Sequence, residues 1–400
     1  MTSASTDPTP SRSRRAIIAT AFGFLVTMMG TTIPTPLYSI YSAELSFSPL
    51  TVTVLFAVYA IGVVGALSMF GRLSDDLGRR PVLLAAVGLA LLSAILFVLP
   101  PSLPLLVGAR VISGLGAGLM SGAGTAAVID LFPSARKAAA GTLAVAVNTG
   151  GLALGTLIAG ALASAAPQPL RTPFIVHAVL CVVAAGGLLA WAPRPVARGR
   201  IRIRAHRLRI PASIRGAFAR AVLAAGAGFA VTGVLTAVAA MFLAHDLHLD
   251  SHLLSGFVVF LAFAGMALGQ LIARRMPPQV ALRGGCAGLV LACAVLAFAL
   301  GQATLAPLIG SAVALGISAG LCLNAGIATT VERVPPAQRG EVSSSFFTGL
   351  YLMLAVPAIG VGVLATVVGL RPAGLVFTAV VAVLVAVIGI VDLVGSRKPV

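Results

Sequence analysis

The segment Gly71-Arg72-Leu73-Ser74-Asp75-Asp76-Leu77-Gly78-Arg79-Arg80-Pro81 carries five charged side chains within nine positions, and long apolar stretches precede and follow it. Charged residues make up only 9% of the chain, so a cluster of this density is exceptional here. An apolar run of about 20 residues is long enough to cross a bilayer as a helix. The segment is therefore predicted to be a short loop at a membrane surface, between two spanning helices.

The composition of the whole chain indicates a membrane protein. Hydrophobic residues account for 59% of the 400 residues, and the mean hydropathy is +1.07. Too little polar surface remains to cover a water-soluble core of this size. The chain is predicted to be an all-α membrane protein.

Apolar runs of spanning length occur twelve times along the chain. Their approximate ranges are 16–37, 50–70, 81–99, 103–131, 138–161, 173–191, 217–244, 253–273, 280–300, 305–331, 342–369 and 373–394. Boundaries set by hydropathy are less certain than the number of spans. Twelve transmembrane helices are therefore expected.

The basic residues predict how the spans are oriented. Of the 27 Lys and Arg residues, all but Arg110, Arg171 and Arg371 fall on one side of the membrane under this assignment. Short cytoplasmic loops retain positive charge, so that side is expected to be the cytoplasm, with both termini on it, in the inner (plasma) membrane of a prokaryote. The same bias explains the net charge of +17 without a nucleic-acid partner.

The charge pattern also divides the chain into five parts. Residues 192–216 are rich in Arg and Pro and are predicted to be a cytoplasmic linker, which either fixes the topology or touches anionic lipid. The expected parts are a tail over 1–15, a six-helix bundle over 16–191, the linker, a second six-helix bundle over 217–394, and a tail over 395–400.

The two halves share a repeated pattern. With a shift of 202 positions, the fourth span matches the tenth at several small residues and at an acid: Gly114 with Gly316, Gly118 with Gly320, and Asp130 with Glu332. The sequence therefore predicts two pseudo-symmetric six-helix bundles. Such duplicated bundles are an architecture of secondary transporters, whose halves move about a site near the midplane.

The loop between the second and third spans resembles the signature of the major facilitator superfamily. The matching positions are Gly71, Leu73, Ser74, Asp75, Gly78, Arg79 and Arg80, and Asp76 stands where the family usually has a basic residue. The resemblance implies the major facilitator fold and transport by alternating access. The duplicated bundles extend it over the whole chain.

The resemblance also implies a gating role for this loop. Asp75, Arg79 and Asp130 would form a charge cluster that holds the halves against the start of the eleventh span, and Glu332 occupies the matching position in the second half. An ion pair that forms in one conformation only biases an equilibrium between two states. The alternative is a loop that fixes the topology without gating.

Arg110 is the one basic residue well inside a predicted span. An Arg at mid-bilayer costs about 2.5 to 3.5 kcal/mol, so it is expected to face the protein interior and to be functional. With Gly114 and Gly118 it resembles the fourth-helix signature of the superfamily, whose Arg is associated with proton and substrate coupling. The alternative is an Arg that hydrogen-bonds the carbonyls of a neighbouring broken helix.

Glycines in the fifth span form a weaker match to the antiporter signature of the superfamily. Gly151, Gly155 and Gly160 fit that signature, whereas Thr156 replaces its proline and Ala159 a glycine. Close helix packing explains the same glycines. Export is favoured mildly.

The acidic residues constrain the substrate, because all ten lie in loops or near the ends of spans. A cavity without a buried carboxylate does not balance a cation, whereas Arg110 favours a neutral or weakly anionic compound. Permanent cations are therefore expected to be poor substrates. Candidate cavity residues are Tyr38, Tyr59, Asn148, Asn324 and Tyr351.

The expected function is secondary active transport, most concretely proton-coupled export of small neutral or weakly anionic drugs or metabolites. The chain carries no nucleotide-binding motif, so an ion gradient would supply the work. No cofactor and no metal site are expected, since a solvated loop explains the histidines near residue 248, and the expected partners are the substrate, protons and lipid around a monomer. The alternatives are an importer or uniporter of a sugar or organic acid and, from another class, a membrane-embedded enzyme or a lipid scramblase.

Overall fold

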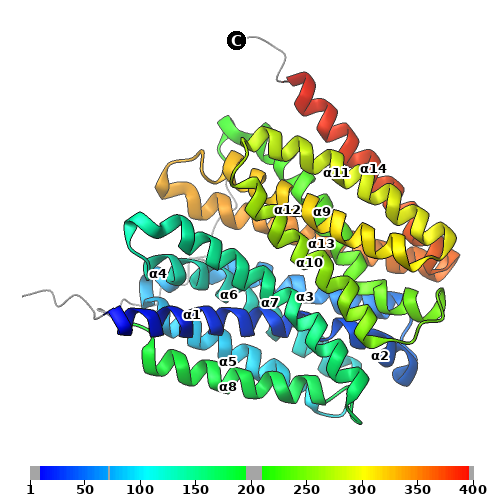
Figure 1. Cartoon of the computed structure of the whole chain (residues 1–400), viewed down its shortest axis with the longest axis horizontal. Helices are drawn as coiled ribbons and strands as arrows, with labels where there is room; N and C mark the ends of the chain where they lie inside the picture. Colours follow the sequence, from blue (N-terminus) through cyan, green and yellow to red (C-terminus); the bar gives the residue numbers. More distant parts are fainter. Residues whose placement is uncertain (1–9, 71–72, 195–209, 396–400) are drawn as a thin grey trace, which may run out of the picture.

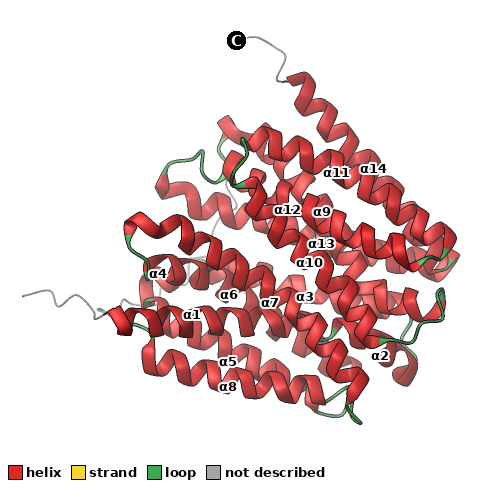
Figure 2. Ribbon diagram, in the orientation of Figure 1, coloured by secondary structure: helices red, strands yellow, loops and turns green. Residues whose placement is uncertain are grey.

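The computed structural model describes residues 10–70, 73–194 and 210–395, and nearly all of these residues are helical (Figure 2). Within them, twelve helices are long and apolar enough to cross a membrane. The predicted fold class is confirmed. Gly71, Arg72, most of the predicted linker and most of both predicted tails lie outside the described residues.

The described residues of the first half form eight α-helices, two of them short. They are α1 (Pro10–Thr32), α2 (Tyr38–Leu45), α3 (Pro49–Phe70), α4 (Leu73–Leu77), α5 (Arg79–Val98), α6 (Leu103–Asp130), α7 (Lys137–Ala165) and α8 (Thr172–Trp191). The second half contains α9 (Arg215–His245), α10 (His252–Ala273), α11 (Pro278–Gln302), α12 (Leu305–Thr330), α13 (Pro336–Val368) and α14 (Leu370–Gly395).

Prolines interrupt the first predicted span. α1 ends at Thr32, and a 3-10 turn over Thr35–Leu37 leads into α2. Pro34 and Pro36 have no backbone N–H to donate to the carbonyls one helical turn before them, so the α-helix does not continue through this segment. α1 thus ends before the predicted range 16–37 does, although the candidate span continues through the turn and α2 to Leu45.

The eleventh span begins earlier than hydropathy indicates. α13 starts at Pro336, whereas the apolar run starts at residue 342. Proline fits the first turn of a helix, because its missing N–H has no intrahelical partner there. The six additional residues are a polar first turn and a half at one end of the bundle.

Close helix crossings repeat between the halves. A Cβ at Gly114 would overlap the carbonyl oxygen of Tyr59 where α6 crosses α3, and a Cβ at Gly316 would overlap the carbonyl oxygen of Ala262 where α12 crosses α10. Glycine lets two helix backbones approach this closely. The repeat read from the sequence is therefore present in the packing as well.

The two halves meet mainly through α3 against α13 and α7 against α10 (Figure 1). One hydrophobic core lies within the second half, and a second lies within the first half apart from Tyr351 at its edge. A third core mixes the halves: it joins Leu37, Phe97 and Phe174 to Met241 of α9 and Ala365 of α13. The molecule is closed at the end where these residues lie.

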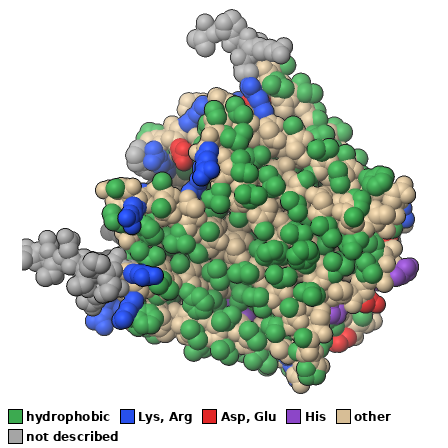
Figure 3. All heavy atoms as spheres, in the orientation of Figure 1, with side chains coloured by type: hydrophobic (Ala, Val, Ile, Leu, Met, Phe, Trp, Pro, Cys, Tyr) green, Lys and Arg blue, Asp and Glu red, His purple; other side chains and the backbone are tan. Residues whose placement is uncertain are grey.

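Charge distinguishes the two ends of the molecule. We call the end with Arg79, Arg274 and Arg283 the basic end, and the end with Glu44 and His252 the opposite end. In Figure 3 most basic side chains lie along the left and upper left of the viewed face, where some acidic atoms also lie, histidine and further acidic side chains lie at the lower right, and hydrophobic side chains cover the surface between them. This band matches a membrane-spanning orientation.

Candidate functional site

Arg110 lies at the centre of the first half, in α6, and is only 1% exposed. Its Nη1 donates to the carbonyl oxygen of Thr31 at 2.7 Å, and its Nε and Nη2 donate to the carbonyl oxygens of Leu55 and Phe56 at 3.3 Å each. Thr31 precedes the proline break at the end of α1. One of the three carbonyls thus belongs to the helix that prolines interrupt, and the other two belong to α3.

Aromatic rings connect Arg110 to the second half. The guanidinium carbon lies 4.9 Å from the ring centroid of Tyr59 in α3. The Tyr59 ring packs edge-to-face against Tyr351 of α13 with centroids 6.1 Å apart, and Tyr351 packs against Phe229 of α9 at 6.2 Å. Guanidinium groups and aromatic rings bind planar organic groups through cation–π and edge-to-face contacts. We call Arg110, Tyr59, Tyr351 and Phe229 the central cluster.

Other predicted cavity residues have unpaired polar atoms. The hydroxyl of Tyr38 and the side-chain oxygen of Asn148 are buried without a hydrogen-bond partner, and so is the hydroxyl of the neighbouring Tyr41. Buried polar atoms are seldom left unpaired. Asn324 is half-buried on α12, in the second half of the chain. The structure thus unites Tyr59 and Tyr351 directly and places the other candidates on surrounding helices.

The predicted gating residues meet at the basic end. Arg79 Nε donates to the Asp130 carboxylate at 3.0 Å, and its Nη1 donates to the hydroxyl of Ser74 at 2.6 Å. These contacts join the start of α5 to the end of α6 within the first half. For Asp75 the structure describes only the backbone, in α4. Contact of this cluster with the start of α13 stays a prediction.

The neighbouring residues of the loop have separate roles in the packing. Arg80 donates from Nη2 to the carbonyl oxygen of Leu189 in α8. Gly78 precedes α5 with a φ of 87°, a conformation that side-chain-bearing residues rarely adopt. The glycine in the signature is thus required by the turn.

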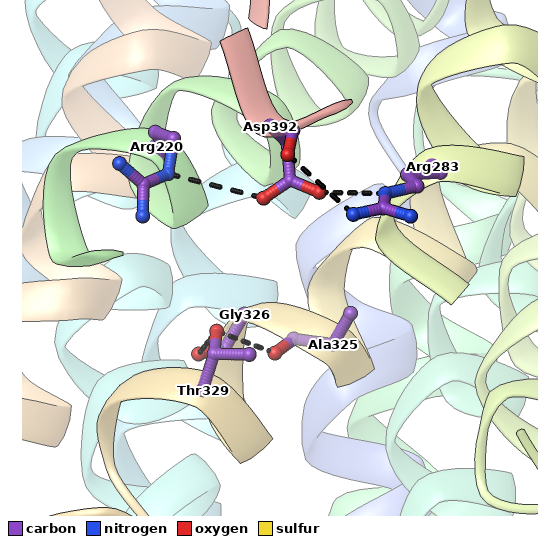
Figure 4. Close-up of polar contacts among 6 residues, drawn as sticks. All are labelled: Arg220, Arg283, Ala325, Gly326, Thr329 and Asp392. Carbon is purple, nitrogen blue, oxygen red and sulfur yellow. Dashed lines mark hydrogen bonds and ion pairs between the residues drawn. The ribbon is translucent and has the colours of Figure 1, made fainter. Parts of the chain in front are cut away.

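A second charged cluster at the basic end was not predicted from the sequence. Asp392 of α14 lies between Arg283 of α11, whose Nε is 2.9 Å from one carboxylate oxygen, and Arg220 of α9, whose Nε is 4.0 Å from the other (Figure 4). The internal repeat could have pointed to this cluster, because Arg283 lies 203 positions after Arg80 and so occupies the matching position in the second half.

Arg274 links the two halves at the basic end. From the end of α10 its Nη1 donates to the hydroxyl of Thr142 at 2.9 Å and approaches the carbonyl oxygen of Ala138 at 3.5 Å, both in the first half. Burial lowers the pKa of Arg274, and the nearby carboxylate of Glu332 opposes that shift. The Glu332 carboxylate therefore favours the charged form of Arg274, whose side chain bridges the two halves.

The glycines of α7 lie at tight contacts. Cβ atoms at Gly151 and Gly155 would crowd the carbonyl oxygens of Leu25 and Met29 in α1, and one at Gly160 would meet the carbonyl oxygen of His252 in the second half. Gly118 packs against Val63 and Ala66 of α3. The glycines singled out in the sequence thus lie where backbones come closest.

Polar contacts continue along the interface of α7 and α10. The side-chain nitrogen of Gln270 lies 3.2 Å from the hydroxyl of Thr149, and the backbone N–H of Leu253 donates to the hydroxyl of Ser164 at 3.1 Å. With the Arg274 contact, this interface is closed along its length.

The profile of the Major Facilitator Superfamily matches residues 20–358 of the chain. This chain belongs to the Major Facilitator Superfamily. The match covers most of both halves, and the family prediction made from the loop motif is confirmed. The chain is therefore a membrane transporter, not an enzyme, and its ligands are small molecules.

Curated relatives match part of this superfamily member. MdtD from Salmonella newport (strain SL254), a protein provisionally named for multidrug resistance, is 31% identical over 153 residues. That match covers 38% of this chain and 33% of MdtD, and MdtD of Salmonella typhi matches to the same extent. The match thus spans about a third of the relatives' length.

Solved structures match the whole superfamily fold. A bacterial homologue of the human lysosomal transporter Spinster, in an inward-facing and unoccupied conformation, has a TM-score of 0.75 at 18% identity and covers 98% of this chain and 100% of that one. A point mutant of the nucleoside transporter NupG has a TM-score of 0.72 at 12% identity and covers 96% of this chain and 99% of that one. At these identities the likeness concerns the fold.

Proposed function

We propose that this transporter exports small neutral or weakly anionic organic compounds in exchange for protons. The observation that carries the proposal is the central cluster, in which a buried guanidinium and three aromatic rings join the two halves. Alternating access places a substrate between the halves of such a fold. A drug or metabolite with a planar ring matches the chemistry of this site.

The charges around the cluster support this choice of substrate. Of the acidic side chains whose burial the structure describes, none is buried, and the exposed or half-buried ones lie near helix ends. Arg110 is held by three carbonyl oxygens, which are dipoles and do not neutralise its charge. A neutral or anionic ligand is therefore favoured over a cation.

The orientation and the state of the protein follow from the same proposal. The basic end faces the cytoplasm of a prokaryotic cell with both termini on that side, as the positive charges favour. The shared core at the opposite end then closes the protein toward the outside. The monomer would sit in lipid along the hydrophobic band.

Export is favoured over import by one sequence relationship. The relative MdtD carries a multidrug-resistance name, and the match to it covers 33% of that protein. An importer or uniporter of a sugar or organic acid is the second candidate. The aromatic character of the central cluster favours an apolar or planar compound over a sugar.

A vesicle assay tests the proposal. Inverted membrane vesicles containing the protein are loaded with acid, and the quenched signal of a pH-gradient dye is followed after addition of chloramphenicol, fluorescein or ethidium. We expect chloramphenicol or fluorescein to release protons and ethidium, a permanent cation, to be without effect. The Tyr351→Ala variant should lose the response, whereas Phe298→Ala, which removes a 58%-exposed ring, should keep it.

The outcomes separate the candidates. Equilibration of radiolabelled solute without any proton release would show a uniporter or importer. Proton release on addition of ethidium alone would contradict the predicted substrate class while leaving antiport intact.

A further inference from the structure

Of the acidic and histidine side chains whose burial the structure describes, His177 alone is buried, at 2% exposure. It lies on α8, five residues after the helix start at Thr172. At 1.5 Å per residue this is about 8 Å into the helix from the opposite end. A titratable side chain within the membrane-spanning region is a candidate for a functional site.

The imidazole is held against α1. Its Nε2 lies 3.0 Å from the carbonyl oxygen of Val26, and its ring fills the space that a side chain at Gly30 would occupy. The thiol sulfur of Cys181, one turn further along α8, lies 3.6 Å from Nε2. Since a carbonyl only accepts, Nε2 carries the hydrogen, and Nδ1, 4.0 Å from the Cys181 sulfur, is the unprotonated nitrogen that can take a proton.

The ring also faces a polar cleft. A narrow cleft lies between α1, α5, α6 and α8, and in this conformation it has no room for a water molecule. Besides His177, the hydroxyl-bearing residues Thr27, Ser93 and Ser113 line it. Phe97 and Phe174 also line it, and their rings stack with centroids 4.4 Å apart. Hydroxyl groups around a histidine can bind the water that delivers a proton.

We infer that His177 is the proton-binding site of this transporter, loaded through the polar cleft when the opposite end opens. The inference rests on the proposed function and assigns its coupling residue. A buried imidazolium without a counter-ion is costly, so the ring is neutral while the cleft is closed. Separation of Phe97 from Phe174 admits water. Nδ1 then takes a proton from hydronium, leaving water, and returns it to water on the other side.

Protonation reaches the central cluster through α1. A charged imidazole strengthens its hydrogen bond to the Val26 carbonyl, since charge-assisted bonds are stronger than neutral ones. Arg110 holds the same helix at the Thr31 carbonyl. Proton binding at His177 and substrate binding at the central cluster would therefore both change contacts of α1. Such a shared helix provides the energetic coupling between the two ligands that antiport requires.

The surroundings of His177 leave few competing charges. Cys181 is the titratable neighbour on its own helix. The described residues of α1 and α5 that line the cleft are not titratable, and α6 contributes Ser113 there. Arg110, one turn before Ser113, is committed to the carbonyls of α1 and α3.

Transport in proteoliposomes tests the inference. His177→Gln keeps an N–H that can donate to Val26 but cannot bind a proton near neutral pH. With fluorescein as the probe, we expect the variant to lose at least tenfold in transport driven by a pH gradient and much less in exchange without a gradient. His245→Gln, at the end of α9, is the matched control and should behave as wild type.

The outcomes are distinguishable. Gradient-driven transport that is equal in wild type and His177→Gln overturns the assignment of His177 and leaves the proposed antiport standing. No gradient-driven transport by the wild type with fluorescein or chloramphenicol overturns the proposed function itself. A merely structural histidine would lower both modes of transport in the same proportion.

A second measurement covers the case in which His177→Gln does not fold. In a protein whose other four histidines are replaced by Gln, ring-nitrogen NMR follows His177 between pH 8 and pH 5, with and without fluorescein. We expect a pH-dependent change from the neutral to the doubly protonated ring that fluorescein shifts. A ring that stays neutral throughout under both conditions overturns the inference.

Discussion

Arg283 donates from Nε to a carboxylate oxygen of Asp392 at 2.9 Å, which joins the start of α11 to the end of α14. The same arginine lies 3.4 Å from the backbone carbonyl of Asp392. In the first half, Arg80 donates to the carbonyl of Leu189, and both pairs are separated by 109 residues. The same arginine-to-carbonyl contact is therefore present in both bundles. In the second half the arginine also binds a carboxylate, that of Asp392.

Replacement of Asp392 by Asn should destabilise the second half. The carboxylate is 14% exposed and faces two arginines, so its replacement removes the negative charge that Arg283 and Arg220 share. A hydrogen bond to a charged group contributes about 1.5 to 3 kcal/mol. We expect a lower unfolding temperature in detergent, with the exposed Glu44→Gln variant unchanged. Equal unfolding temperatures for Asp392→Asn and wild type would contradict this role.

Replacement by alanine should have opposite effects on stability at two glycines of α6. A Cβ at Gly114 would overlap the backbone of Tyr59, whereas a Cβ at Gly108 would meet no atom within 4 Å. We expect Gly114→Ala to cost about 1 to 3 kcal/mol through overpacking. Gly108→Ala should be neutral or stabilising by up to about 1 kcal/mol, because alanine favours the helix.

The repeat provides an independent check on the glycine prediction. Gly316 and Gly310 occupy the matching positions of α12, the first against the backbone of α10 and the second in open space. Unfolding temperatures of the four single variants should fall into the same two classes in both halves. Loss of stability in Gly310→Ala as large as in Gly316→Ala would show that packing geometry does not decide the outcome.

Arg110→Lys should impair transport although it keeps the positive charge. A single ammonium group cannot take the place of three guanidinium nitrogens that reach carbonyls on α1 and α3. We expect fluorescein transport to fall at least tenfold in proteoliposomes with equal amounts of protein. Arg371→Lys, which alters an arginine bound to the carbonyl of Gly301 at the opposite end, should fall less than twofold.

Composition, the lengths of the apolar runs, the internal repeat and the loop motif were sufficient to predict the fold. Twelve apolar runs, the charge bias and the repeat between Gly114 and Gly316 predicted the architecture because each depends on residue type alone. Two helix ends differ from the predicted ranges: α1 ends at Thr32, before a proline-containing turn, and α13 begins at Pro336. Hydropathy does not register backbone hydrogen bonds, so it could not place these ends.

The candidate site was less accessible from sequence. Arg110 stood out as a buried charge, but its carbonyl partners have no residue identity that a sequence pattern could reveal. Tyr59 and Tyr351 were chosen as polar aromatics in apolar runs, and only the packing of α3 against α13 brings them together. Asp392 was not predicted as a site residue, because the matching position in the first half is Leu189 and the repeat therefore shows no shared charge there.

Asp246 should make the stability of the protein depend on pH. Burial raises the pKa of this carboxyl above its ordinary 3.8, and the charges of Arg371, His245 and His248 partly oppose the shift. The folded state then holds the proton more tightly than the unfolded state. The resulting stability is complete below pH 3.8 and is lost as the pH rises through the raised pKa. Asp246→Asn should therefore show a smaller decline in unfolding temperature over that interval, and an unchanged decline would contradict the assignment.

Arg274→Ala should shift the protein toward opening at the basic end. Its guanidinium crosses from α10 to the Thr142 hydroxyl at 2.9 Å, so its removal weakens the contact between the halves without affecting the shared core at the opposite end. Arg274 is exposed, so loss of this bond costs about 0.2 to 1 kcal/mol and changes a two-state ratio by up to about fivefold. Spin labels at Lys137→Cys and Arg275→Cys should report a larger population of long distances, with the exposed Arg333→Ala as the control. Distance distributions identical to those of the control would show that Arg274 does not hold the halves together.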